Sequence, residues 1–273
     1  MNKNDRPLIL LTNDDGIRSP GLWAAAEALS SLGYVVVAAP RDQSSGAGRS
    51  MPRNSDGSIR QEEVKVGGKC WPVYAVGGSP AQSVQHGVLE IAERKPDLVV
   101  AGINYGENVG IAITISGTVG AALEGAALGI PALAVSLETD MSFHLSYSNE
   151  VDFSVAAHFT HLFAQQILSN ERLPDMDVLK VDVPNDATLD TPWQYTRISR
   201  GKYYFPVIAP READQTDGPI TYGIAEDADT WEEGSDIHTV RVAKHVSVTP
   251  ISLDMTSRVD RDQLTTWFSP DQM

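Results

Sequence analysis

The chain has 273 residues, of which 42% are hydrophobic, and a formal net charge of −15 at pH 7. This charge argues against binding to nucleic acid polymers, because the Lys/Arg surface that counterion release requires is missing. A cation or backbone N–H groups can still hold one small phosphate locally. No apolar run approaches the roughly 18–20 residues that span a bilayer, and the run near the N-terminus is too short for a signal peptide. With a single cysteine, Cys70, an internal disulfide is excluded, and we expect a cytoplasmic globular protein without a membrane partner.

Apolar strands alternate with helices through the first 183 residues. Ser-Pro pairs at 19–20 and 79–80 are typical of helix starts, and glycines at 33 and 129 of helix ends. Near-continuous apolar strands between helices favour a mostly parallel sheet covered on both faces, an αβα three-layer arrangement. The expected strands are 8–12, 34–39, 73–76, 97–101, 131–137 and 178–183; the expected helices are 20–32, 80–94, 118–128 and 149–168; and 41–60 and 102–117 are expected as long loops.

The pattern changes after residue 183. Separated strands are expected at 195–200, 203–207, 220–223 and 245–251, followed by a terminal helix at 257–268. The region is poor in helix signals, and its acidic run at 226–236 is typical of a solvated loop. We therefore predict one domain, 1–273, composed of a core (1–183), an extended β arm or hairpin used in oligomerisation (184–250) and a C-terminal helix (251–273).

Three polar loops follow strands of the predicted sheet. They are NDDG (13–16), RDQSSGAGRS (41–50) and the long segment from GINYGENVG (102–110) to ISGTVG (115–120). Ligands of open parallel sheets bind beyond the carboxyl ends of the strands, so these loops are expected to meet at one site.

The tandem carboxylates Asp14 and Asp15 are the feature that most needs an explanation, since like charges repel beside a buried strand. With the hydroxyl of Ser45 and the amide oxygen of Asn104, they offer four oxygens that suit Mg²⁺ or Mn²⁺. The alternative is an Asx-turn with a helix-capping carboxylate and no metal.

A second candidate site lies at Ser116, Gly117 and Thr118, which open a helix. Backbone N–H groups at a helix N-terminus bind anions, although a plain capping role explains the same residues. No P-loop is present, and the segment GGSPA (77–81) lacks the second glycine of a nucleophile elbow.

The sequence resembles the SurE family, the survival-protein-E nucleotidases, in six segments that follow one another in order. The resemblance implies metal-dependent hydrolysis of nucleoside 5′- and 3′-monophosphates, a Rossmann-like core and a C-terminal arm exchanged between subunits of a homodimer, which can pair again into a tetramer. The segments are LLTNDDGIRSPGL (10–22), APRDQSSGAG (39–48), VGGSPAQSV (76–84), PDLVVAGINYGENVG (96–110), SGTVGAALEGAALGIPALAVS (116–136) and HVSVTPISLDMT (245–256).

Residue roles follow from the same resemblance. It implies one divalent metal ion per subunit, Mg²⁺ or Mn²⁺, with Ser44 as an alternative to Ser45. The expected metal ligands are Asp14, Asp15, Ser45 and Asn104; the expected catalytic residues are Asp14, Asp15 and Asn104; the expected phosphate-binding residues are Asn13, Gly46, Asn108, Ser116, Gly117 and Thr118. No general base is assigned.

The chain departs from the family pattern at Gln82-Ser83, at Gly48-Arg49 and at Ile115, all expected near the mouth of the pocket. These departures leave the preferred base and the physiological substrate open, and we expect several nucleoside monophosphates to be used. Two rival functions are a covalent aspartyl-phosphate phosphatase, which the tandem rather than alternating carboxylates disfavour, and a nucleotide-binding or metal-sensing module without turnover.

Overall fold

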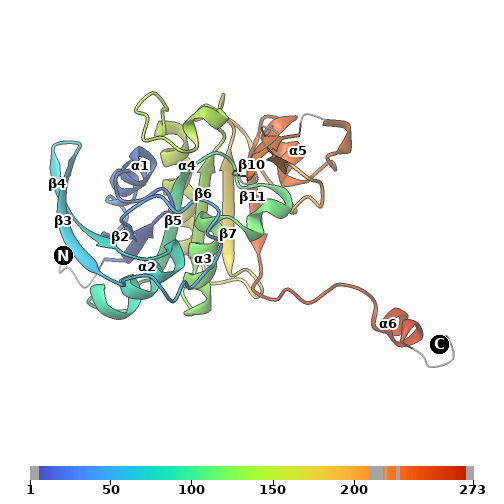
Figure 1. Ribbon diagram of the computed structural model, residues 1–273, viewed down its shortest axis with the longest axis horizontal. Coiled ribbons are helices and arrows are strands. Elements are labelled where there is room, and N and C mark those ends of the chain that lie inside the picture. Colours follow the sequence, from blue (N-terminus) through green and yellow to red (C-terminus); the bar gives the residue numbers. More distant parts are fainter. Residues whose placement is uncertain (1–5, 209–217, 219, 226–227, 269–273) are drawn as a thin grey trace.

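The computed structural model describes residues 6–208, 218, 220–225 and 228–268. Its central sheet has nine strands in the order β3-β4-β2-β1-β5-β6-β7-β11-β8, and the six from β4 to β7 are parallel, as the sequence predicts (Figure 1). The strands are β1 (Leu8–Thr12), β2 (Tyr34–Pro40), β3 (Ile59–Val66), β4 (Lys69–Val76), β5 (Leu98–Tyr105), β6 (Ala132–Leu137), β7 (Val178–Val183), β8 (Trp193–Tyr195) and β11 (Val246–Ile251).

Helices cover both faces of this sheet, which gives the expected Rossmann-like three layers. On one face α1 (Pro20–Leu29) packs beside α4 (Ser154–Ser169), and on the other α2 (Pro80–His86) packs beside α3 (Gly117–Ala127). The small side chains of α3 let it approach the sheet closely, since a Cβ at Gly125 would lie 2.8 Å from Val99 Cβ. Along the chain α1 follows β1, α2 follows β4 and α3 follows β5, so these helices begin on the carboxyl side of the parallel strands.

Helix boundaries differ from the predicted ones where local capping decides them. Ser79 and Gln82 form a capping box at the start of α2, but the helix ends at His86 and continues only as a π-helical turn, Gly87–Ile91. α4 begins at Ser154 rather than at residue 149, because residues before it form turns. Shorter 3-10 helices lie at Gly110–Thr114, Met141–Phe143 and Ala228–Thr230.

Strand β3 was missed, since part of it was assigned to a loop. It pairs antiparallel with β4, which begins at Lys69 rather than at residue 73. Gly67 and Gly68 join the two strands and both have positive φ, 56° and 77°, the conformation that tight hairpin turns require. β3 lies at the edge of the sheet, and its half-buried residues alternate with exposed polar residues. It therefore lacks the continuous apolar run that predicts the other strands.

The segment after residue 183 is more integrated than predicted. β11 pairs antiparallel with β7 and parallel with β8, so both strands belong to the central sheet of their own chain. A helix, α5 (Asp236–Arg241), capped by Ser235, lies where little helix was expected. The acidic run 226–236 is not wholly a solvated loop, because Trp231 and Asp236 are buried; residues 226–227 lie outside the described residues.

A separate antiparallel hairpin, as expected, is formed by β9 (Tyr204–Ile208) and β10 (Ile220–Ile224); residues 209–217 and 219 lie outside the described part of the chain. Beyond β11 an extended segment leads to α6 (Arg261–Trp267), which lies apart from the body (Figure 1). In the described residues no helix has the length and apolar character needed to cross a membrane. The division at 183 and 250 stays a prediction.

Candidate active site

The carboxyl ends of the central strands bring the predicted residues to one edge of the sheet. Asp14 and Asp15 follow β1 directly and Asn104 lies near the end of β5, which pairs with β1. The two carboxylates are buried, with exposed fractions of 5% and 1%. Two adjacent buried acids are costly unless something compensates their charge.

Asp14 lies against the N-terminus of α3. Thr118 Oγ1 donates a hydrogen bond to Asp14 Oδ1, and the backbone N–H of Ser44 donates to the Asp14 carbonyl oxygen at 2.7 Å. A Cβ at Gly117 would lie 2.6 Å from Asp14 Cβ, so only glycine fits there. Asp14 thus contacts the first turn of α3, whose N-cap is Ser116, and lies against part of the predicted anion site.

Asp15 is compensated less well than Asp14. It accepts hydrogen bonds from Gln43 Nε2 at 3.0 Å and from the backbone N–H of Tyr105 at 3.3 Å. Burial, followed by the charge of Asp14, raises the pKa of Asp15 well above its ordinary value, and burial also raises the pKa of Asp14. A bound cation would favour the ionised form of both groups.

The amide nitrogen of Asn104, a predicted metal ligand, is used in hydrogen bonds to the backbone. Its Nδ2 donates to the carbonyl oxygens of Tyr105 at 3.0 Å and Gly106 at 2.7 Å, which fixes the orientation of the amide. The oxygen is thereby left for another partner. Within the described residues, no group of three or more His, Cys, Asp or Glu side chains is placed to hold a metal, so neutral oxygens would have to complete the ligand set of Asp14 and Asp15.

The serines of the second loop differ in their contacts. Ser44 donates its hydroxyl to the Asp42 carbonyl oxygen at 3.3 Å and its backbone N–H to Asp14, whereas Ser45 is exposed. Gly46 has a φ of 74° and forms the turn that follows. The assignment of Ser45 rather than Ser44 to a metal stays a prediction.

Several predicted phosphate-binding residues already have structural partners. Asn13 is fully buried and its amide holds the NDDG turn through two 3.1 Å hydrogen bonds with the Gly16 backbone. Ser116 caps α3 by accepting from Val119 N at 3.1 Å. Asn108 differs, because its Nδ2 is buried and has no hydrogen-bond partner. Among the predicted residues, Asn108 thus carries a free donor.

Sequence reasoning missed two residues beside the carboxylates. Gln43 donates to Asp15 and also, at 2.7 Å, to the carbonyl oxygen of His144, whose Nδ1 lies 3.0 Å from the hydroxyl of Tyr222 on β10. The His144 ring packs over Gly106, where a Cβ would lie 2.5 Å from its Nε2. Sequence offers no signal for these contacts, because the partners are 28 to 101 positions apart in the chain.

The departures from the family pattern lie near the site without entering it. Arg49 Nε pairs with Glu124 Oε2 of α3 at 2.7 Å, and Gln82 Nε2 donates to the Pro52 carbonyl oxygen at 3.1 Å. Ile115 is 59% exposed. Arg49 is thus neutralised by Glu124 in this structure.

The structure is that of a Rossmann-like α/β protein with a buried pair of carboxylates at the carboxyl edge of its parallel strands. The family described as Survival protein SurE matches residues 9–204. The chain belongs to the SurE family.

Individual relatives agree with this assignment. The chain is 43% identical over 256 residues to a 5′-nucleotidase SurE of Thermococcus gammatolerans, covering 94% of each chain, and 40% identical to that of Thermococcus kodakarensis, covering 94% of this chain and 96% of the relative. The crystal structure of the Sure protein from Aquifex aeolicus superposes with a TM-score of 0.72 at 33% identity, covering 96% of this chain and 100% of that one.

Proposed function

We propose that the protein is a metal-dependent 5′-nucleotidase that hydrolyses nucleoside 5′-monophosphates to a nucleoside and inorganic phosphate. The observation that carries the proposal is the buried pair Asp14 and Asp15, which lies at the same carboxyl edge of the sheet as the oriented amide of Asn104 on the neighbouring strand β5. The names of the similar SurE proteins support the substrate class.

The donor set fits one Mg²⁺ or Mn²⁺ per subunit. Asp14, Asp15, Asn104 and Ser45 would hold the ion through hard oxygen atoms, and the two carboxylates would balance its charge. When bound, the ion supplies Lewis-acid stabilisation of the phosphoryl group and a nucleophile at neutral pH.

The chain's own residues bind and orient the phosphate. Asn108 offers its unpartnered Nδ2 as a donor to a phosphoryl oxygen. The first turn of α3, at Gly117 and Thr118, supplies the positive end of a helix dipole close to Asp14. Burial of the edge excludes bulk water from these contacts and strengthens them.

The nucleoside is expected in a cavity beside the second loop. This cavity has a volume of about 420 Å³, within the range of small-molecule sites. Polar residues dominate its lining, among them Arg41, Ser44, Asn54, Asp56 and Ser79. No apolar slot for one base is formed there, which favours use of several nucleotides.

Hydrolysis of 3′-monophosphates, a cytoplasmic location and a homodimer belong to the same proposal.

Release of inorganic phosphate from a panel of nucleoside 5′- and 3′-monophosphates tests the function. We expect turnover with Mg²⁺ or Mn²⁺, no turnover in EDTA, and rates within about tenfold among the bases, which corresponds to about 1.4 kcal/mol. Nucleotide binding without phosphate release would instead establish the binding module. A phosphorylated aspartate trapped on the chain would establish the aspartyl-phosphate mechanism.

A further inference from the structure

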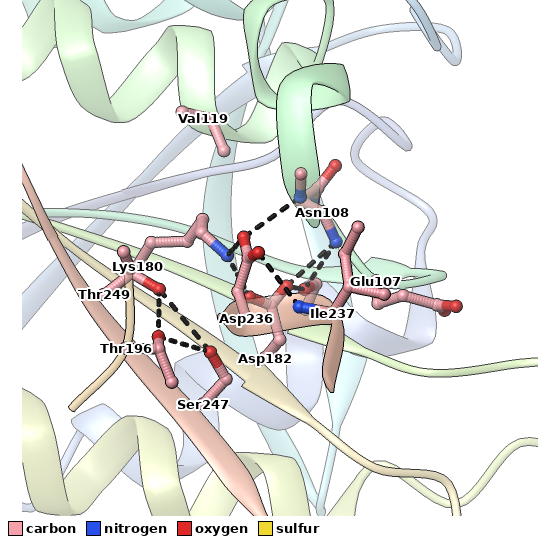
Figure 2. A network of polar contacts seen from close by, with 12 residues as sticks. Glu107, Asn108, Val119, Lys180, Asp182, Thr196, Asp236, Ile237, Ser247 and Thr249 are labelled. Atoms are coloured by element: carbon pink, nitrogen blue, oxygen red, sulfur yellow. Dashed lines mark hydrogen bonds and ion pairs between the residues drawn. The ribbon is translucent and has the colours of Figure 1, made fainter. Parts of the chain in front are cut away.

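A buried cluster of charges lies beside the candidate site and has no part in the mechanism above. Lys180 on β7 is 1% exposed, and its ammonium group faces two fully buried carboxylates, Asp182 and Asp236 (Figure 2). Lys180 Nζ contacts Asp182 Oδ2 and lies 3.2 Å from Asp236 Oδ2. Burying three charges is expensive, and a buried ion pair is often no more stabilising than apolar residues of equal volume. The cluster therefore needs a reason beyond stability.

Strand register places this cluster next to the site. Asn104 of β5 pairs with Ser136 of β6, Ser136 with Asp182 of β7, and Asp182 with Ser247 of β11. These four residues form a row across the sheet that begins at a predicted metal ligand. The hydroxyls of Ser247 and its neighbours Thr196 and Thr249 bond to one another on the far side of the row (Figure 2).

Both carboxylates also hold the loop that carries Asn108. The backbone N–H of Asn108 donates to Asp182 Oδ1 at 2.9 Å and to Ser136 Oγ at 3.2 Å, and Ser136 Oγ donates to Asp182 Oδ1. Two residues further on, the backbone N–H of Gly110 donates to Asp236 Oδ2 at 3.0 Å. The loop is thus fixed at two points by carboxylates that Lys180 in turn holds together.

Asp236 connects the same loop to the C-terminal part of the chain. Its Oδ1 accepts from the backbone N–H groups of Ser199 and Ile237, both at 2.9 Å. Asp182 and Asp236 thus anchor the Asn108 loop to β7 and to α5, while the Asn108 side chain keeps its buried Nδ2 free.

We propose that Lys180, Asp182 and Asp236 form a positioning triad that fixes the Asn108 loop so that Asn108 Nδ2 faces the substrate phosphoryl group. The proposal rests on the phosphate-binding role of the site. An exposed loop would have to be ordered each time a phosphate bound, and pre-ordering it lowers that cost. The triad acts through Asn108 and does not touch substrate.

Asp182→Asn tests the triad. Asp182 Oδ2 accepts from Lys180 and Oδ1 from the Asn108 backbone, and asparagine replaces one of these two oxygens with an NH₂ group, which donates, so one of the two contacts loses its acceptor. With Mg²⁺ present, we expect KM for a nucleoside 5′-monophosphate and Kd for inorganic phosphate, measured by calorimetry, to rise at least tenfold, with a smaller fall in kcat. Thr196→Val is the matched control, because Thr196 is a buried neighbour whose hydroxyl bonds to the hydroxyls of Ser247 and Thr249 and not to the carboxylates of the triad in the described contacts. It should leave both constants within about twofold.

A double-mutant cycle separates positioning from general destabilisation. If Asp182 acts through Asn108, the variant Asp182→Asn/Asn108→Ala should bind phosphate no more weakly than Asn108→Ala alone. If the double variant binds phosphate more weakly than Asn108→Ala, so that the two losses of affinity multiply, the triad is refuted. An unchanged Kd for phosphate in Asp182→Asn would refute it as well. Should Asp182→Asn fail to fold, Ser136→Ala removes only the hydroxyl that shares the Asn108 N–H. It is expected to raise Kd about threefold, and an unchanged Kd would count against the triad.

Measuring phosphate release by the wild-type chain separates a failure of this inference from a failure of the proposed function. A wild-type chain that binds phosphate but releases none from nucleotides refutes the nucleotidase while the phosphate titrations still decide the triad. A wild-type chain that neither binds phosphate nor releases it from nucleotides overturns both.

Discussion

Among single residues, the two neighbouring carboxylates after β1 carry the proposed chemistry. Asp15→Asn removes one charge from the site and retains its shape. A single catalytic contact commonly carries about 10²–10³ in rate, so phosphate release at saturating Mg²⁺ should fall by about that factor. Asp152→Asn is the matched control, since Asp152 is exposed and asparagine caps a helix equally well. Turnover near the wild-type value in Asp15→Asn would exclude Asp15 from the site.

In the absence of metal, Asp15→Asn should raise the stability of the protein, although it lowers the activity. Because burial raises the pKa of Asp15 in the folded chain, the folded state binds more protons than the unfolded state above the ordinary carboxyl pKa. The stability of the metal-free protein therefore falls as pH rises from that value toward the raised pKa. In EDTA at pH 7, Asp15→Asn should melt a few degrees above the wild type, at about 2–4 °C per kcal/mol.

Added metal should change the melting temperatures of the wild type and of Asp15→Asn differently. Mg²⁺ or Mn²⁺ should raise the Tm of the wild type and leave that of Asp15→Asn nearly unchanged. A metal-free variant that melts below the wild type would show that the hydrogen bonds from Gln43 and Tyr105 outweigh the buried charge.

Two neighbouring serines of the second loop are expected to differ in their contribution to metal binding. Ser45→Ala should raise the Mg²⁺ concentration needed for half-maximal activity several-fold, since one oxygen ligand is lost, and Ser44→Ala should not. Metal titrations of phosphate release measure this difference. The reverse result would move the ligand to Ser44, whose backbone already touches Asp14.

At the scale of elements, the packing of α3 against the NDDG turn sets the geometry of the site. In Gly117→Ala the new Cβ would meet Asp14 Cβ at 2.6 Å, so the turn or the helix must move. We expect a loss of about 1–3 kcal/mol in stability and a fall in kcat/KM of at least tenfold. Ala127→Gly is the control, because it costs about 1 kcal/mol of helix propensity at an exposed position of the same helix. Equal activities in the two variants would refute a role for the α3–Asp14 contact.

At the scale of the whole molecule, the prediction concerns assembly. Of the two strands that were expected to offer open edges for pairing with another chain, 245–251 corresponds to β11, which pairs on both sides within its own sheet, and 195–200 shares only Tyr195 with β8, the last strand of that sheet. The exposed apolar residues Met255, Trp267 and Phe268 lie instead on the segment that leaves the body (Figure 1). Exchange of such a segment is a low-cost route to a closed dimer.

Light scattering tests the assembly. The full chain is expected to form a homodimer, which can pair into a tetramer, and a chain ending at Asp254 is expected to be monomeric at micromolar concentration. Phosphate release by the shortened chain serves as its folding control, because α6 does not contribute to the described site. A full-length monomer would refute the exchange.

The sequence by itself determined the alternating core and the place of the site. Apolar runs such as 8–12 and 97–101, punctuated by caps and glycines, predict parallel strands between helices, because buried parallel strands need apolar residues on both faces. The tandem carboxylates Asp14 and Asp15 after the first strand then mark the carboxyl edge. These signals are local, since each is carried by residues close together in the chain.

Only the tertiary structure decided which partners those residues have. Gln43 and His144 meet beside Asp15 although they lie 101 positions apart, and Asp182 and Asp236 converge on the Asn108 loop from different elements. Likewise, β11 joins the central sheet, because pairing with β7 covers an edge that the first 183 residues leave open, and α5 packs beside β11. Hydrogen bonds and ion pairs depend on distances in space, and a single sequence fixes such distances only after the strands have found their order and register.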